Sequence, residues 1–136
     1  MVLRSERSRF IFVYGTLRGV PPNPYSNRLK VSSTFLGKGE MEGRLFHLGT
    51  YPGALHLPNA RSSVVGEIYE ILDQELIPWL DLYEGISPHD EYFRDVIPIT
   101  VEGIIIPCWS YLLRQVRSNY TLIPSGDWLV RQSPPG

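Results

Sequence analysis

The stretch "RFIFVYGTLRG", Arg9–Gly19, decides the fold because it joins an apolar run to an abrupt polar end. Five apolar or aromatic residues follow Arg9 without a polar break. Such a run is typical of a strand covered on both faces, so a central strand is expected over 9–14. The run ends in Gly15 and Thr16. Glycine lets the main chain approach a ligand closely, and successive amides in such a turn can bind an anion. A simple strand end followed by a turn is the alternative.

The length, composition and charge of the chain limit the number of domains and the kind of partner that it can have. Its 136 residues fit one domain over 1–136, with an ordered core expected at about 9–130. Apolar residues make up 43% and charged residues 20%, as in an ordinary globular protein. Thirteen cations and 14 anions give a formal charge of −1, which argues against nucleic acid as the main partner.

Localisation signals are sparse. Cys108 is the only cysteine, so no internal disulfide can form and nothing indicates secretion. The start, "MVLRSERSRF", has no apolar stretch that resembles a signal peptide. No segment approaches about 18 consecutive apolar residues, so no membrane span is expected. The cytoplasm is the expected compartment, and the oligomeric state is left open, with a monomer compatible.

The remaining elements are mostly strands. Strands are expected at 64–71, 92–101 and 104–113, the last two joined as a hairpin by a turn at Glu102-Gly103. Weaker patterns predict a bent or bulged hairpin at 34–49, a proline-rich loop at 19–25 that leads into a short helical turn, a loop at 51–59, and an extended tail at 116–136.

One helix is expected after Asp73, with an apolar stripe of Leu76, Leu80 and Tyr83, and a stop at Gly85. Pro78 lies late for a first-turn proline, so the helix is expected to start later or to bend there. Many strands and one or two helices indicate an α+β domain or a mixed barrel.

Metal and nucleophile patterns are weak. The three histidines, His47, His56 and His89, have no ligand spacing, so no metal site is expected. Cys108 lies in an apolar strand, where a small buried thiol is the ordinary explanation and a catalytic nucleophile the alternative. The sequence contains neither a nucleophile elbow nor a phosphate-loop signature. No cofactor is expected.

Glu84 is the carboxylate with a distinctive position, since it lies in the last turn of the expected helix. The helix macrodipole disfavours an anion there by about 0.3–1 kcal/mol. If the carboxyl is also desolvated, its pKa is expected to be raised, as suits a group that takes and returns a proton. A solvent-exposed helix end beside Asp81 is an equally good interpretation of the position alone.

Five motifs occur in order: "VYGTLR", "GEIYEI", "LDLYEG", "YFRDVIPI" and "WSYLL". Together they resemble the γ-glutamylcyclotransferase-like family, and within it the small γ-glutamylamine cyclotransferase-like proteins, from about Phe10 to Trp128. The resemblance implies a mixed, mainly antiparallel β-barrel flanked by one or two helices, with a cavity at one end. It implies Glu84 as the catalytic acid, and substrate-binding residues Tyr14, Gly15, Thr16, Leu17 and Tyr111.

The reaction that the resemblance implies is an intramolecular one. The α-amine of a small γ-glutamyl substrate attacks its own γ-carbonyl and releases 5-oxoproline with an amine or amino acid. Tyr51 and Tyr92 are candidate pocket walls. Arg18 is assigned no contact. Tyr92 and Arg94 share one face of their strand by alternation, so they either reach the pocket or form a partly exposed pair at the barrel rim; the rim is the expectation for Arg94, and Tyr92 is left open. Two other hypotheses stay open: a non-catalytic module that binds a small carboxylate, and an interaction domain that uses the loop "GVPPNPY".

Overall fold

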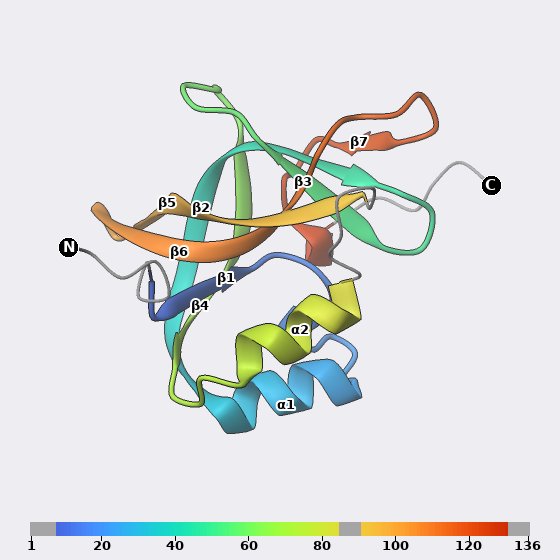
Figure 1. Ribbon diagram of the computed structural model, residues 1–136. Helices are drawn as coiled ribbons and strands as arrows, with labels where there is room; N and C mark the ends of the chain where they lie inside the picture. The colour runs from blue at the N-terminus through green and yellow to red at the C-terminus, as the bar shows by residue number, and fades with distance from the viewer. Residues whose placement is uncertain (1–7, 85–90, 131–136) are drawn as a thin grey trace.

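The computed structural model describes residues 8–84 and 91–130, with the backbone alone at Glu84 (Figure 1). Five strands form a closed barrel. In spatial order they are β2 (Ser33–His47), β4 (Ser63–Ile71), β1 (Phe10–Val13), β6 (Ile104–Leu113) and β5 (Tyr92–Val101), and a pairing of β5 with β2 closes the ring.

The β1–β6 pairing is parallel and the other pairings are antiparallel. This arrangement confirms the expected mixed, mainly antiparallel barrel. Two shorter strands, β3 (Pro52–His56) and β7 (Thr121–Ile123), extend the sheet by pairing with the second half of β2.

Strand β1 is the central strand that its apolar run predicts, since it lies between β4 and β6. Side chains alternate across a strand, so successive residues serve two different cores. Phe12 packs inside the barrel, whereas Ile11 and Val13 pack toward the helices, and all three are at most 2% exposed. Burial on both faces explains why no polar residue interrupts the run.

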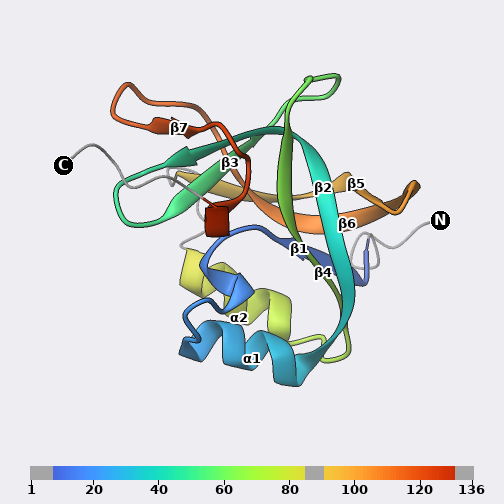
Figure 2. The same ribbon diagram turned by 180° about the vertical axis from the view of Figure 1, so that it is seen from behind.

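Two helices, α1 (Pro24–Ser32) and α2 (Leu76–Glu84), lie side by side against one side of the barrel, as the two opposite views show (Figures 1 and 2). Leu29 of α1 and Leu76 and Leu80 of α2 are fully buried against the outward-facing side of β1. The helix layer therefore covers the strand from which the turn at Gly15 leaves.

Helix α1 is longer than the short helical turn expected after the proline-rich loop. The Asn23 side chain accepts hydrogen bonds from the amides of Tyr25 and Ser26, and Ser26 completes a capping box. Only Leu29 among its apolar residues is buried, so the helix lacks the apolar stripe that reveals a helix in sequence. Its cap and the packing against α2 define it instead.

Two weaker predictions were wrong. The segment 34–49 is not a hairpin but most of the single 15-residue strand β2, with the expected irregularity at a bulge between Phe35 and Gly37. The segment 51–59 contains β3 rather than only a loop. At Gly39 the backbone of β2 passes close to Ile99 across the barrel, because an added Cβ would lie 2.8 Å from the Ile99 side chain.

The stronger patterns are confirmed. The hairpin of β5 and β6 has the expected bounds, and its turn places Glu102 and Gly103 at positive φ, +49° and +81°. Helix α2 starts at Leu76, so Pro78 lies in its first turn, where the missing amide is tolerated. The expected stop at Gly85 lies outside the described residues.

The segment after β6 carries more structure than the extended tail expected for it. It contains β7 and the short 3₁₀ helix η3 (Trp128–Val130), whose Trp128 is buried in the barrel core. None of the described helices is both long enough and apolar enough to cross a lipid bilayer.

Candidate functional site

The turn after β1 is a fixed piece of backbone. The 3₁₀ helix η2 (Thr16–Arg18) follows Gly15, and its hydrogen bonds are donated by the amides of Arg18 and Gly19, at 2.9 and 3.0 Å. Within the part of the chain that the structure describes, no hydrogen bond is donated by the amides of Gly15, Thr16 or Leu17. Three consecutive donors therefore remain available at the end of the central strand.

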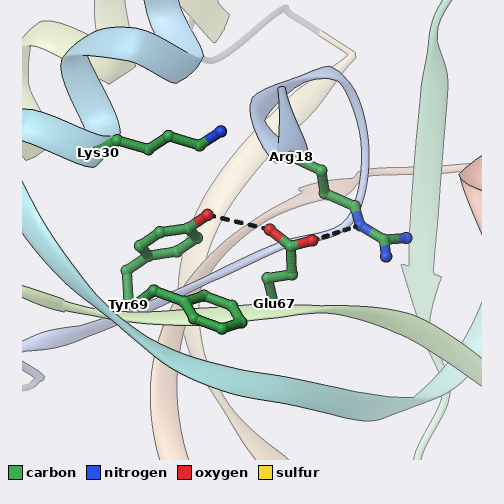
Figure 3. A pocket seen from close by; sticks show the side chains of 5 residues that line it. Arg18, Lys30, Glu67 and Tyr69 are labelled. Carbon is green, nitrogen blue, oxygen red and sulfur yellow. Dashed lines mark hydrogen bonds and ion pairs between the residues drawn. The ribbon is translucent and has the colours of Figure 1, made fainter. Parts of the chain in front are cut away.

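Arg18 anchors this turn through an ion-pair network. Its side chain is only 2% exposed, and its guanidinium donates to Asp127 Oδ1 at 2.7 Å and to Glu67 Oε2 at 3.3 Å. The other oxygen of Glu67 accepts the Tyr69 hydroxyl at 3.0 Å (Figure 3). Burial and the neighbouring Glu67 carboxylate raise the pKa of Tyr69, so its hydroxyl stays protonated and donates.

A cavity of about 310 Å³ lies beside this network, on the helix-covered side of the sheet (Figure 3). Its lining residues come from η2, α1, β2 and β4: Arg18, Lys30, Phe35, Glu67 and Tyr69. The Arg18 guanidinium and the Glu67 carboxylate are already bonded within the protein. The cavity is thus bounded by the same contacts that hold the turn.

The turn also touches the end of helix α2. The hydroxyls of Thr16 and Tyr83 lie 3.1 Å apart, and the Tyr83 ring stacks on Tyr25 of α1 with centroids 3.7 Å apart. Tyr83 immediately precedes Glu84, the last residue of α2. The side chain of Glu84 lies outside the described residues, and what the structure gives is that the residue before it contacts the turn.

Tyr111 lies on the helix-facing side of β6, in the same cluster as Leu80. Its hydroxyl donates to Asp81 Oδ1 of α2 at 2.7 Å. Arg94 also binds Asp81, with side chains 24% and 25% exposed, whereas Tyr92, its neighbour on the same face of the strand, is buried, so the two do not form a partly exposed pair. Tyr111 thus contacts the last turn of α2.

Tyr14 and Tyr92 surround the start of β3 instead. The Tyr14 hydroxyl accepts the amide of Ala54 at 3.2 Å and donates to the Tyr111 carbonyl at 2.7 Å. The Tyr92 hydroxyl donates to the carbonyl of Pro52 at 2.6 Å. Both rings are buried in clusters other than that of Tyr111, so the structure does not bring the three tyrosine rings onto one face.

Tyr51 lies just before β3 and is 41% exposed. Its hydroxyl donates to Glu91 at 3.1 Å. Partial burial and the bonded Glu91 carboxylate raise the pKa of Tyr51. Its hydroxyl contact is thus at the surface.

The remaining candidates for chemistry are the Cys108 thiol and groups of side chains that could bind a metal ion. Cys108 is fully buried, and desolvation raises the pKa of its thiol to about 12, so the thiol stays protonated at neutral pH. This environment agrees with the interpretation of Cys108 as a small buried side chain. Across residues 8–83 and 91–130, no three His, Cys, Asp or Glu side chains gather closely enough to hold a metal ion.

Three charged residues at the site were not singled out from the sequence: Glu67, Asp81 and Asp127. No sequence pattern indicates a site at Glu67 or Asp127, because Arg18, which forms ion pairs with both, is far away in sequence. The sequence does contain a feature that could have singled out Asp81. A carboxylate in the last turn of a helix is disfavoured by the macrodipole, so a compensating cation is expected nearby. That partner, Arg94, lies on a different element.

The comparisons with known proteins agree with this architecture. The profile of the family described as "Gamma-glutamyl cyclotransferase, AIG2-like" matches residues 11–130. The rat protein named Gamma-glutamylaminecyclotransferase is 42% identical over 129 residues, which cover 84% of each chain. The YtfP family protein of Escherichia coli K12 is 32% identical over 122 residues, which cover 89% of this chain and 96% of that one.

Solved structures show the same fold. The crystal structure of a mouse AIG2-like protein superposes with a TM-score of 0.65 at 27% identity, over 91% of this chain and 84% of that one. The chain therefore belongs to the gamma-glutamyl cyclotransferase, AIG2-like family.

Proposed function

We propose that this protein is an enzyme that cyclises a small γ-glutamyl amide to 5-oxoproline and releases an amine or amino acid. Family membership supports the reaction type. The available amides of residues 15–17 support recognition of a carboxylate, because main-chain N–H groups in a turn bind anions.

The proposed reaction needs a proton carrier but no nucleophile from the protein. The substrate ammonium loses a proton to Glu84, and the free α-amine attacks the γ-carbonyl carbon. A new C–N bond closes the five-membered lactam as the original amide C–N bond breaks. The first proton passes from Glu84 to the leaving nitrogen as that bond breaks. Glu84 then takes the second proton from the ring nitrogen and returns it to the released amine, so the products are a neutral lactam and an ammonium group, and Glu84 ends as it began. A carboxyl in this role typically contributes a hundredfold or more in rate.

The turn at residues 15–17 would increase the rate further by orienting the substrate. Cyclisation requires the substrate to fold back on itself, and holding that conformer removes several kcal/mol of entropic cost from the barrier. Amides at the end of β1 are a suitable anchor, because Ile11, Phe12 and Val13 before them are at most 2% exposed and packed on both faces.

The observation that carries the proposal is the contact between Thr16 and Tyr83, at 3.1 Å. It joins the turn that would hold the α-carboxylate to the residue that precedes Glu84. An anion anchor and a proton carrier can serve one small substrate only if they lie within a few ångströms of each other.

Product formation tests the proposal directly. Nε-(γ-glutamyl)lysine and γ-glutamylalanine are incubated with wild type, Glu84→Gln and the control Glu70→Gln, and 5-oxoproline is quantified by mass spectrometry. Wild type and Glu70→Gln are expected to turn over at least one substrate, with a loss of at least a hundredfold in Glu84→Gln. Glu70 is a matched control because it pairs with the exposed Arg9, outside the site.

Two results would contradict the proposal. Equal rates in wild type and Glu84→Gln would remove Glu84 from the reaction. Saturable binding of either compound in calorimetry, without product, would instead support a module that binds small carboxylates.

A further inference from the structure

The Asp81 carboxylate receives three hydrogen bonds from the barrel. The Tyr111 hydroxyl donates to Oδ1 at 2.7 Å, and Arg94 donates from Nε to Oδ1 at 2.9 Å and from Nη2 to Oδ2 at 3.1 Å. Two parallel bonds from one guanidinium are the geometrically most specific way to hold a carboxylate. Both oxygens of Asp81 are therefore fixed relative to the sheet.

The two donors stand on a rigid platform. Arg94 of β5 and Tyr111 of β6 are direct partners in the antiparallel register, so their side chains leave the hairpin next to each other. The guanidinium carbon of Arg94 also lies 4.3 Å from the centroid of the Trp109 ring, a cation–π contact that supports it from the sheet. Neither donor depends on a loop for its position.

Asp81 lies in the last turn of α2, three residues before Glu84. Side chains three residues apart on a helix are neighbours, with Cβ atoms about 5–6 Å apart. A carboxylate in this turn does not stabilise the helix itself, because the macrodipole disfavours it. Its bonds to Arg94 and Tyr111 give it a different role, since they hold this turn against the barrel.

We propose that Asp81, Arg94 and Tyr111 are positioning residues that fix the last turn of α2, and with it Glu84, relative to the anion-binding turn. The inference rests on the proposed function of Glu84. Tyr83 holds the same helical turn to Thr16, so the turn is attached both to the hairpin and to the loop. Misplacement by about 1 Å can cost a hundredfold in rate, so two attachments are mechanistically useful.

The network also sets the charge beside Glu84. In wild type the Arg94 cation cancels the Asp81 anion. Among the described residues, the ionisable groups packed around this part of α2 are Asp81 and Tyr83 on the helix itself, Tyr25 from α1, Arg94 from β5 and Tyr111 from β6. Removal of either charged partner leaves the other without its counter-charge at the last turn of α2, which carries Glu84.

The test compares pH profiles of kcat and KM for the turned-over γ-glutamyl substrate in Asp81→Asn, Arg94→Gln and the double variant. Each single variant is expected to lose at least tenfold in kcat with KM within twofold. The acid limb of the kcat profile moves to lower pH in Asp81→Asn, because a cation is left, and to higher pH in Arg94→Gln. In the double variant, which carries neither charge, the acid limb of the kcat profile returns to its wild-type pH.

A merely structural role would not produce opposite shifts. Shifts of the same sign, or none, in variants that fold as judged by circular dichroism would overturn the inference, while the effect of Glu84→Gln still supports the proposed function. If no wild-type turnover is found, the proposed function and this inference fail together. The control Glu70→Gln, which lies in an exposed ion pair, keeps the wild-type profile.

Tyr111→Phe keeps the inference testable if the charge variants do not fold. It removes one hydrogen bond from Asp81 and changes no charge. A severalfold loss in kcat with an unmoved acid limb is expected, and an unchanged kcat would contradict a positioning role for Tyr111.

Discussion

At Gly15 the main chain passes so close to Pro52 that no side chain fits between them. A Cβ added to Gly15 would lie 2.5 Å from Cγ of Pro52, well inside a normal contact. Pro52 is itself held, because its carbonyl accepts the Tyr92 hydroxyl. The glycine of the turn is therefore required by packing against β3, whatever ligand its amide binds.

This contact predicts the effect of Gly15→Ala. The added methyl group forces β3 or the turn to move, and overpacking of this kind costs about 1–3 kcal/mol. The free energy of unfolding, measured in urea, is expected to fall by that amount. Pro52→Ala removes the clashing ring atoms, so the double variant should recover part of the loss. No recovery would mean that the strain does not arise from Pro52.

At the scale of elements, Arg18 ties the turn after β1 to two other segments. Glu67 belongs to β4, and Asp127 precedes η3 near the end of the described chain. A buried guanidinium shared by two carboxylates connects three segments that are distant in sequence. The turn is held by this tether from one side and by Tyr83 from the other.

Arg18→Met is expected to destabilise the protein by about 3 kcal/mol, because it leaves two largely buried carboxylates without their cation. Arg9→Met is the matched control, since the Arg9 side chain is 71% exposed in its pair with Glu70 and should cost less than about 1 kcal/mol. Urea denaturation of both variants measures the difference. Similar losses in the two would contradict a specific role for the Arg18 network.

At the scale of the whole molecule, the barrel is organised around β1. The strand pairs on both edges, and the barrel core and the helix layer bury its two faces. Opening it requires both layers to separate, whereas β7 pairs with β2 alone. Local stability should therefore decrease from β1 toward the extension formed by β3 and β7.

Native-state hydrogen exchange measures this gradient. The amides of Ile11, Phe12 and Val13 that pair with β4 or β6 are expected to exchange last, at rates set by global unfolding. Those of Thr121–Ile123 should exchange earlier through local opening. Equal protection of the two strands would show that the barrel and its extension unfold as one unit.

Periodic patterns made several elements predictable. The unbroken apolar run of β1, the alternation in β4 and the hairpin with its turn at Glu102-Gly103 all depend on neighbours in sequence. The full length of helix α1 and the strand β3 escaped prediction because they depend on packing against distant segments. Gly53 is an example, since a Cβ there would lie 2.6 Å from Leu113 of β6.

The sequence by itself determined the central strand, the mixed mainly antiparallel barrel and the family, because each depends on local pattern or on motif order. Glu84 and residues 15–17 stay predictions from the same motifs. Only the tertiary structure decided which partners these segments have. Arg18 with Asp127, Thr16 with Tyr83, and Asp81 with Arg94 and Tyr111 join residues from different elements. Such pairings arise from barrel closure and helix docking, which no local pattern in the chain encodes.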